Sequence, residues 1–419
     1  MRHMNLDMEI INIIDVKFGN HTEINNGILT INKVELLDFI ANPIFESLNV
    51  ELARPGESVR IIPVKDVIEP RIKITGSGGS FPGFLDSIQG TGEGKTKTLR
   101  GCGVVTTGKI VGFQEGIIDM SGIGAEYCYF SKLNNVVIIG EVIEGTSPAK
   151  HEEAMRIAGL KAAHYLSLST KNTPADDIES YKLELVEDLP KVAIVYLIMA
   201  QGLLHDNYLY GVDAKRLHPT LVHPNEILDS ALVSGNCVVA SDKHTTYDHQ
   251  NNPLIKELYA RHGVDLDFKG VIITPVYPGL ADKERCCTSA VNISRLMGLD
   301  AILIPEEGGG NPDADLMMIC RMAEQKGIKT VMITAPNGGE EPVADVTTEA
   351  DAVIDVGYVL EKVLLPKIEK VIGHPEQIAL LSGGSEDSLK NDGSIYASVA
   401  VIMGAHNEMG MTKLTTKLY

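Results

Sequence analysis

The pattern of apolar and polar positions changes character near residue 149. Before it, short apolar runs alternate with glycine-rich turns such as GSGGSFPG, and an Asn26-Gly27 pair marks a hairpin turn. Short runs bounded by turn residues are typical of β-strands, so we expect a β-rich N-terminal domain over residues 1–149. The runs that indicate its strands are IINIIDVKF (10–18), GILTINK (27–33), SVRIIPV (58–64), PRIKI (70–74), GKIVGF (108–113) and NVVIIGEVI (135–143).

From residue 150 the pattern is that of alternating helices and strands. Apolar residues recur at helical spacing over 150–168, and later apolar runs are unbroken, as in strands buried on both faces of a parallel sheet. The order predicts a doubly wound, mostly parallel α/β domain over residues 150–419. Its strands are expected at 191–199, 270–276, 301–307 and 330–335, and two of its helices at 283–297 and 314–326.

Composition narrows the functional class. The chain has 37 Lys and Arg against 56 Asp and Glu, a net charge of −19, and it has no Trp, so neither a nucleic-acid backbone nor base stacking fits it. The longest apolar run, 192–204, is too short to span a bilayer, and no apolar stretch follows the first basic residue as in a signal peptide. We therefore expect a cytoplasmic enzyme, with most of its six cysteines reduced and buried.

Common cofactor motifs are missing. GTGEGKT at 90–96 resembles the end of a phosphate-binding loop, but position 89 is Gln where the motif needs Gly. No G-x-G-x-x-G follows a strand in the α/β half, and no histidine pair has the spacing of a metal site. Six of the twelve histidines do fall within 205–262. This density indicates either proton-transfer chemistry or a polar surface loop, and both interpretations stay open.

Within that segment lies ALVSGNCVVAS at 231–241. Gly235 allows a strained turn, and the Cys237 thiol could attack the Asn236 carbonyl and move the acyl group from nitrogen to sulfur. Elimination from the resulting ester would leave dehydroalanine, which hydrolyses to a pyruvoyl group at a new amino terminus. The alternative is an ordinary buried cysteine on a strand.

Several long blocks of the sequence share one resemblance. They include VSGNCVVASDKHTTYDHQNNPLIKELYARHG (233–263), ELARPGESVRIIPVKDVIEPR (51–71), GKIVGFQEGIIDMSG (108–122), QGLLHDNYLYGVDAK (201–215), GNPDADLMMICR (310–321), GIKTVMIT (327–334) and KVIGH (370–374). These blocks resemble one family, the protein B proproteins of clostridial glycine reductase and of its sarcosine and betaine counterparts. The similarity covers essentially the whole chain.

The resemblance implies cleavage between Asn236 and Cys237, with Cys237 becoming the pyruvoyl cofactor of the smaller fragment. Condensation of a substrate amine with that carbonyl would withdraw electrons from its C–N bond. The family also implies partners: a selenoprotein subunit of protein B whose selenolate displaces nitrogen, then selenoprotein A, and protein C, which releases acetyl phosphate. Glycine, sarcosine and betaine all stay open as substrates.

Two further residues lie on family-like blocks, and each has an ordinary alternative. Asp242 could hold a lysine or histidine in place, or be a turn residue. His205 could donate a proton to the leaving thiol or amine, or be a hydrogen-bonded core histidine. Two rival functions also remain: a D-proline reductase-type pyruvoyl proprotein, and an unprocessed paralogue that binds an amine or scaffolds the selenoprotein.

Overall fold

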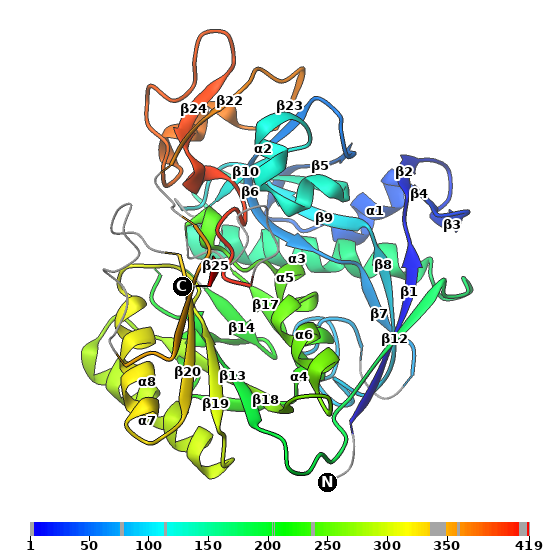
Figure 1. Ribbon diagram of the computed structural model, residues 1–419. Helices are drawn as coiled ribbons and strands as arrows, with labels where there is room; N and C mark the ends of the chain where they lie inside the picture. Colours follow the sequence, from blue (N-terminus) through cyan, green and yellow to red (C-terminus); the bar gives the residue numbers. More distant parts are fainter. Residues whose placement is uncertain are drawn as a thin grey trace.

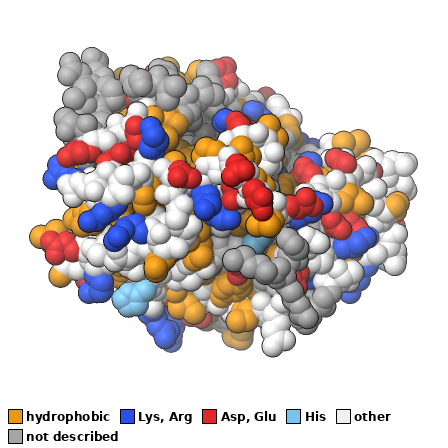
Figure 2. Space-filling model, turned by 60° about the horizontal axis from the view of Figure 1, so that its bottom comes forward, with side chains coloured by type: hydrophobic (Ala, Val, Ile, Leu, Met, Phe, Trp, Pro, Cys, Tyr) orange, Lys and Arg blue, Asp and Glu red, His pale blue; other side chains and the backbone are white. Residues whose placement is uncertain are grey.

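The computed structural model describes residues 4–75, 79–112, 115–202, 204, 206–235, 239–335, 349–357 and 361–409, and the backbone of 417–418. It confirms the α/β class, with a mixed assembly of sheets beside a mostly parallel one (Figure 1). Among these residues, no helix is long and apolar enough to cross a bilayer. Acidic and basic side chains are interspersed over the face in Figure 2, so the negative net charge is not gathered there in one patch.

A seven-stranded sheet forms the centre of the C-terminal half. Its order is β16-β18-β13-β19-β20-β21-β25, and the five middle strands are parallel. Numbered along the chain, those five have the order 2-1-3-4-5, which is that of the flavodoxin-like doubly wound fold. The bounds are β13 Lys191–Met199, β16 Thr220–Val222, β18 Asp267–Val276, β19 Ala301–Pro305, β20 Lys329–Thr334, β21 Ala352–Asp355 and β25 Lys417–Leu418.

Helices cover both faces of this sheet, as unbroken apolar strands require. Along β13, Val195 and Leu197 pack against α7 (Leu280–Leu296) and α8 (Asp313–Glu324). The alternate residues, among them Tyr196, pack toward α6 (Pro253–Arg261) on the other face. Because successive strand residues point to opposite faces, β13 is buried almost completely.

The N-terminal half is β-rich as expected. The strand predicted at 108–113 is wrong, because residues 108–112 form a loop with bends between β9 and β10. This half has a six-stranded sheet, β10-β6-β9-β11-β5 with β23 added beside β6, and a four-stranded sheet, β12-β1-β8-β7. The helix predicted at 150–168 is α3 (Pro148–Leu168), which packs across β6, β7, β9 and β11. The strands are β1 Asn5–Asn12, β5 Phe45–Ala53, β6 Val59–Ile68, β7 Arg71–Lys73, β8 Gly94–Arg100, β9 Cys102–Thr107, β10 Gly116–Asp119, β11 Asn134–Val142, β12 Asp177–Lys182 and β23 Lys370–Gly373.

The Asn26-Gly27 turn is confirmed. It joins β3 (Glu23–Asn25) to β4 (Ile28–Ile31), with positive φ values of 49° and 75° at its two central residues. A small third sheet results, because β4 also pairs with β2 (Asp15–Phe18). The remaining elements that pack around these sheets are α1 Lys33–Ile40, α2 Gly122–Tyr127, β22 Lys362–Leu365 and β24 Ile395–Ser398.

Two strands from beyond residue 149 pair with the N-terminal sheets. β12 is antiparallel to β1, and β23, near the end of the chain, is parallel to β6 (Figure 1). The two halves are therefore interleaved in sequence. The proposed division at residue 149 stays a prediction.

Candidate functional site

Three of the four residues singled out from the sequence, Asn236, Cys237 and His205, lie outside the described part of the chain. The fourth, Asp242, is described and is 1% exposed. The candidate site is therefore built from the residues that adjoin the gap at 236–238.

Gly235 is held from both sides. Its N–H donates to the Asp206 carbonyl at 2.5 Å, and its own carbonyl accepts from Lys243 Nζ at 2.5 Å. The same ammonium group donates to the Lys65 carbonyl at 2.6 Å. Ser234 is anchored as well, because its N–H donates to Thr246 Oγ1 at 3.0 Å. The carbonyl of the peptide plane that leads into Asn236 is thus fixed by one charge-assisted hydrogen bond from Lys243.

Local structure places these partners. β14 (Asn207–Leu209) pairs antiparallel with β17 (Leu232–Ser234), so Asp206 lies opposite Gly235. After the gap, Ala240–Asp242 form a single 3₁₀ turn, and α5 (Thr246–Gln250) begins at a capping box of Thr245 and Asp248. This turn and helix direct Lys243 back toward Gly235.

The site lies at the carboxyl ends of the central strands. In doubly wound sheets ligands bind there, where the strand order reverses, and in this sheet the reversal falls between β13 and β19. Glu307, just after β19, accepts from Met199 N at 3.1 Å, Asn207 Nδ2 at 2.6 Å and His244 N at 3.3 Å. Burial raises the pKa of Glu307 to about 7.

Two histidines that the sequence analysis did not select are completely buried here. Tyr196 OH lies 3.0 Å from His244 Nδ1 and 2.9 Å from His249 Nδ1. Burial lowers the pKa of His244 to about 3 and that of His249 well below its usual value, so both rings are neutral near pH 7. The signal for them was the histidine density within 205–262. The sequence did not show which of these histidines are buried: His218, for example, is exposed.

Two carboxyl groups each have one oxygen without a hydrogen-bond partner in the described structure, Asp242 Oδ2 and Glu408 Oε1. The other oxygens are bonded: Ser241 Oγ donates to Asp242 Oδ1 at 2.7 Å, and His244 Nε2 lies 3.0 Å from Glu408 Oε2. Burial raises the pKa of Asp242 to about 7 and that of Glu408 well above its usual value. Unbonded buried oxygens of this kind can accept hydrogen bonds from a donor such as an amine.

A small cavity adjoins Ser234 and Gly235. It has a volume of about 20 Å³ and is lined in part by Ser234, Gly235, Lys65, Asp66 and Arg156. Such a volume holds roughly one water molecule. The cavity lies between Gly235 and the N-terminal sheets, so both halves of the chain contribute to the surroundings of the site.

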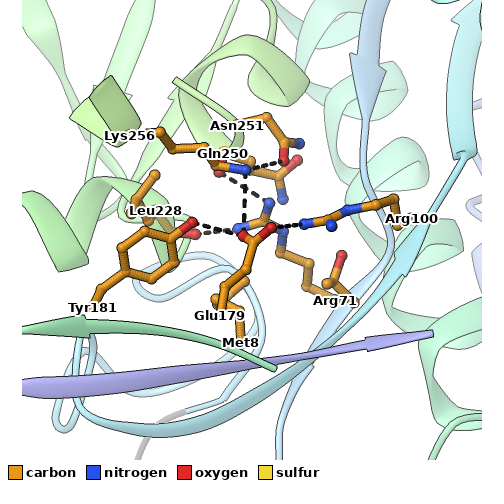
Figure 3. A pocket seen from close by; sticks show the side chains of 10 residues that line it. Met8, Arg71, Arg100, Glu179, Tyr181, Leu228, Gln250, Asn251 and Lys256 are labelled. Carbon is orange, nitrogen blue, oxygen red and sulfur yellow. Dashed lines mark hydrogen bonds and ion pairs between the residues drawn. The ribbon is translucent and has the colours of Figure 1, made fainter. Parts of the chain in front are cut away.

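A second polar pocket, shown in Figure 3, is filled by its own ion pairs. Glu179 accepts from Arg100 at 2.6 Å and from Tyr181 OH at 2.7 Å, and it lies 3.6 Å from Lys256 Nζ. Arg71, beside it, donates to the Gln250 carbonyl at 2.9 Å. These contacts join β8 and β12 to the α/β half, and we assign the pocket a structural role.

The five described cysteines are buried and unbridged, as expected. Burial raises their thiol pKa values where a shift is resolved, to about 12 for Cys128 and about 11 for Cys286. Thiols held protonated in this way are poor nucleophiles. Among the described residues, no cluster of His, Cys, Asp and Glu has the arrangement of a metal site.

Comparison with known proteins gives one family. The family described as glycine/sarcosine/betaine reductase component B subunits matches residues 4–417. The chain is 48% identical to "Glycine reductase complex component B subunits alpha and beta" of Acetoanaerobium sticklandii, over 99% of this chain and 100% of the relative. With the same coverage, it is 47% identical to the sarcosine and 36% identical to the betaine reductase component B subunit alpha of Peptoclostridium acidaminophilum.

A more distant relative bears on one rival function. The D-proline reductase proprotein of Acetoanaerobium sticklandii is 20% identical over 75% of this chain and 52% of its own length. No solved structure matches the chain.

Proposed function

The chain belongs to the glycine/sarcosine/betaine reductase component B subunits, components of oxidoreductases, and we propose that it is the self-processing proprotein of such a component. The proposed cleavage falls between Asn236 and Cys237. Its product is a covalent pyruvoyl group on the fragment that begins at residue 237.

The observation that carries this proposal is the pair of hydrogen bonds that hold Gly235, one from Lys243 and one to the Asp206 carbonyl, which we call the clamp on Gly235. Attack of a thiol on the preceding carbonyl needs a fixed geometry, since free rotation of the chain would separate the reacting atoms. Lys243 holds the Gly235 carbonyl, which belongs to the peptide plane that leads into Asn236, and Asp206 holds the N–H on the other side of Gly235. On the other side, the Ala240 carbonyl accepts from Gly404 N at 2.8 Å, so the returning chain is anchored too.

Asp242 is the described group best suited to proton transfer during processing. Its pKa of about 7 lets it both take and give a proton near neutral pH. Its Oδ2 is free to do so, while Ser241 orients the other oxygen. We assign Asp242 this role and keep His205 as the proposed donor to the leaving group.

The described residues also suit the pyruvoyl group itself. When present, it supplies an electron-withdrawing carbonyl to a bound amine. Lys243 would keep the neighbouring backbone in place, and Asp242 and Glu408 offer the unbonded oxygens that an amine can contact. Almost complete burial of these side chains excludes bulk water.

The names of the relatives support two parts of the proposal. One curated relative is a single chain whose name gives two subunits, alpha and beta, as expected for a cleaved proprotein. "Complex component" in the same name supports action with partners. For this chain we propose a cytoplasmic complex with the selenoprotein subunit of protein B, selenoprotein A and protein C, and glycine, sarcosine or betaine as substrate.

The two rival functions make different predictions about cleavage and about similarity to known proteins. A D-proline reductase-type proprotein would also be cleaved, but the low identity and partial coverage of that relative disfavour it. An unprocessed amine-binding or scaffolding paralogue would keep an intact chain.

A denaturing gel of the purified protein tests the proposal. We expect two bands, of residues 1–236 and 237–419, and a single uncut band for Cys237→Ala. Cys286→Ala, which removes a buried thiol in α7, is the matched control and should cleave normally. Cleavage of Cys237→Ala, or a folded wild-type chain that stays whole, would rule the proposal out.

A further inference from the structure

Residues 402–409 lie beside the turn that follows the proposed cut. Gly404 N–H donates to the Ala240 carbonyl at 2.8 Å. His406 N–H donates to the Ser241 carbonyl at the same distance, 2.8 Å. We call residues 402–409 the docking segment. Figure 1 shows it as part of the red ribbon that leads from β24 toward α5.

The docking segment also contacts the six-stranded sheet of the N-terminal half. Met403 N–H donates to the Ile117 carbonyl, in β10, at 3.0 Å. The apolar side chains of Ile402, Met403 and Ala405 are at most 1% exposed. They belong to the same apolar core as Ile117 and Ala240. The docking segment is thus held by burial and by main-chain hydrogen bonds on both of its sides.

The turn Ala240–Asp242 depends on these contacts. Ala240 and Ser241 are 1% and 0% exposed, so bulk water does not reach their carbonyl groups. A buried carbonyl without a donor costs free energy, and the docking segment supplies a donor to each of the two. The docking segment therefore stabilises the path that the chain takes after the proposed cut.

The docking segment acts on the other side of the proposed cut through Lys243. Asn407 Nδ2 donates to the Lys243 carbonyl at 3.4 Å, and Lys243 Nζ in turn donates to the Gly235 carbonyl at 2.5 Å. The next pair along the two segments is also in contact, with His244 Nε2 at 3.0 Å from Glu408 Oε2. The docking segment thus holds the chain after the cut directly, and Gly235, before the cut, through one side chain.

The docking segment comes late in the chain. The contact between Asn407 and Lys243 spans 164 positions. Within that span lie β18, β19, β20 and β21, which together with β13 are the parallel strands of the central sheet. Because synthesis runs from the amino end, the docking segment can reach the turn only after all these strands have been made.

We propose that the docking segment times processing, so that cleavage at the proposed site follows its docking against Ala240–Lys243. The timing rests on the proposed function, since it presupposes a cut. Asn407 is a positioning residue for processing, because it acts on Gly235 through Lys243. The cut is made in a chain whose parallel strands are already complete.

This order of events protects the central sheet. β13 belongs to the fragment 1–236, whereas its neighbours β18 and β19 belong to 237–419. In an uncut chain the connection keeps these strands at a high effective concentration relative to one another, but separate fragments meet only by diffusion. Unpaired strand edges in such fragments also favour aggregation. Late cleavage avoids both costs.

Arrested translation of the full chain tests the timing. The 419 residues are followed by a linker, which when short leaves the docking segment inside the ribosome and when long releases it. Strands β13 to β21 are outside the ribosome in both cases. We expect the short-linker chain to stay whole and the long-linker chain to be cut. Cleavage of the short-linker chain, or the same result with both linkers, would overturn the timing.

A matched pair of variants tests Asn407. Asn407→Leu removes the buried donor to Lys243, and we expect the folded chain to be cut about 10-fold more slowly, as for the loss of one buried hydrogen bond. Asn135→Leu removes a buried donor to the Phe130 carbonyl in the N-terminal half. It should lower the thermal unfolding temperature to a similar extent and be cut at the wild-type rate. Equal cleavage rates in the two variants would contradict the positioning role of Asn407.

Failure of the timing is distinguishable from failure of the proposed function. A free wild-type chain that is folded and whole would rule out processing, and the timing with it. If the free wild-type chain is cut and the short-linker chain is cut as well, only the timing is wrong.

Discussion

At the scale of residues, the site depends on buried ionisable groups, each of which is held in one protonation state. Lys243 illustrates this, because it is 1% exposed and donates to two backbone carbonyls, Gly235 and Lys65. A buried ammonium group is costly unless it is bonded in this way. Its role in the account is to fix the backbone ahead of the cleaved bond.

Replacing Lys243 with Met should slow processing. The change leaves two buried carbonyls without their donor and frees Gly235, and a hydrogen bond to a charged group contributes about 1.5–3 kcal/mol. We therefore expect cleavage that is at least about 10-fold slower, followed as the loss of the full-length band after synthesis. Lys283→Met, which removes another buried lysine in α7, should cleave at the wild-type rate. Equal rates for Lys243→Met and wild type would show that the clamp is dispensable.

Asp242 gives a stability prediction with a definite sign. Its pKa rises from 3.8 to about 7 on folding, so the folded state keeps a proton that the unfolded state loses. The contribution of Asp242 to the free energy of unfolding is complete below about pH 4. It is lost as the pH rises toward about 7, and it amounts to on the order of 4 kcal/mol in all. Urea unfolding at several pH values measures how the free energy of unfolding falls as the pH rises. This fall should be smaller for uncleaved Cys237→Ala carrying Asp242→Asn than for Cys237→Ala alone. Parallel pH curves would contradict the buried, protonated Asp242.

The sequence identified this segment but not its key partners. Asn236 and Cys237 stood out because their chemistry is local, a thiol following a carbonyl. Lys243, Tyr196 and Glu408 did not stand out, because their roles come from contacts over 8 to 213 positions along the chain. No local spacing records such contacts, and the two buried histidines could not be told from exposed ones.

At the scale of elements, the position of the site is set by the carboxyl ends of the central strands. β13 and β19 are neighbours in the sheet, and the residues after them, with β14, supply Asn207 and Glu307. The sequence predicted β13, α7 and α8 well, because each carries its own apolar pattern. The pairings of β12 with β1 and of β23 with β6 were not predicted, since strands distant in sequence carry no shared pattern.

This interleaving predicts the behaviour of the cleaved protein. β13 belongs to the fragment 1–236, yet its two neighbours, β18 and β19, belong to 237–419. Cleavage therefore leaves the central sheet intact, and the fragments should elute together from a sizing column at the volume of uncut Cys237→Ala. They should separate only in denaturant. Separate elution under native conditions would contradict the sheet order.

At the scale of the whole molecule, one chain of 419 residues forms two interleaved halves with the site between them. The net charge of −19 disfavours nucleic-acid partners, and the family places the chain in a multi-component reductase. The proposed cut, between residues 236 and 237, falls inside the α/β half. The functional unit in this account is thus two polypeptides that share a single core.

The most direct test of this central claim is the intact mass of the denatured wild-type protein, before and after treatment with hydrazine. We predict two masses, those of residues 1–236 and of 237–419 with residue 237 converted to pyruvoyl, and a hydrazine adduct on the smaller fragment alone. A single mass for the unmodified 419-residue chain, from protein shown to be folded, would contradict the account.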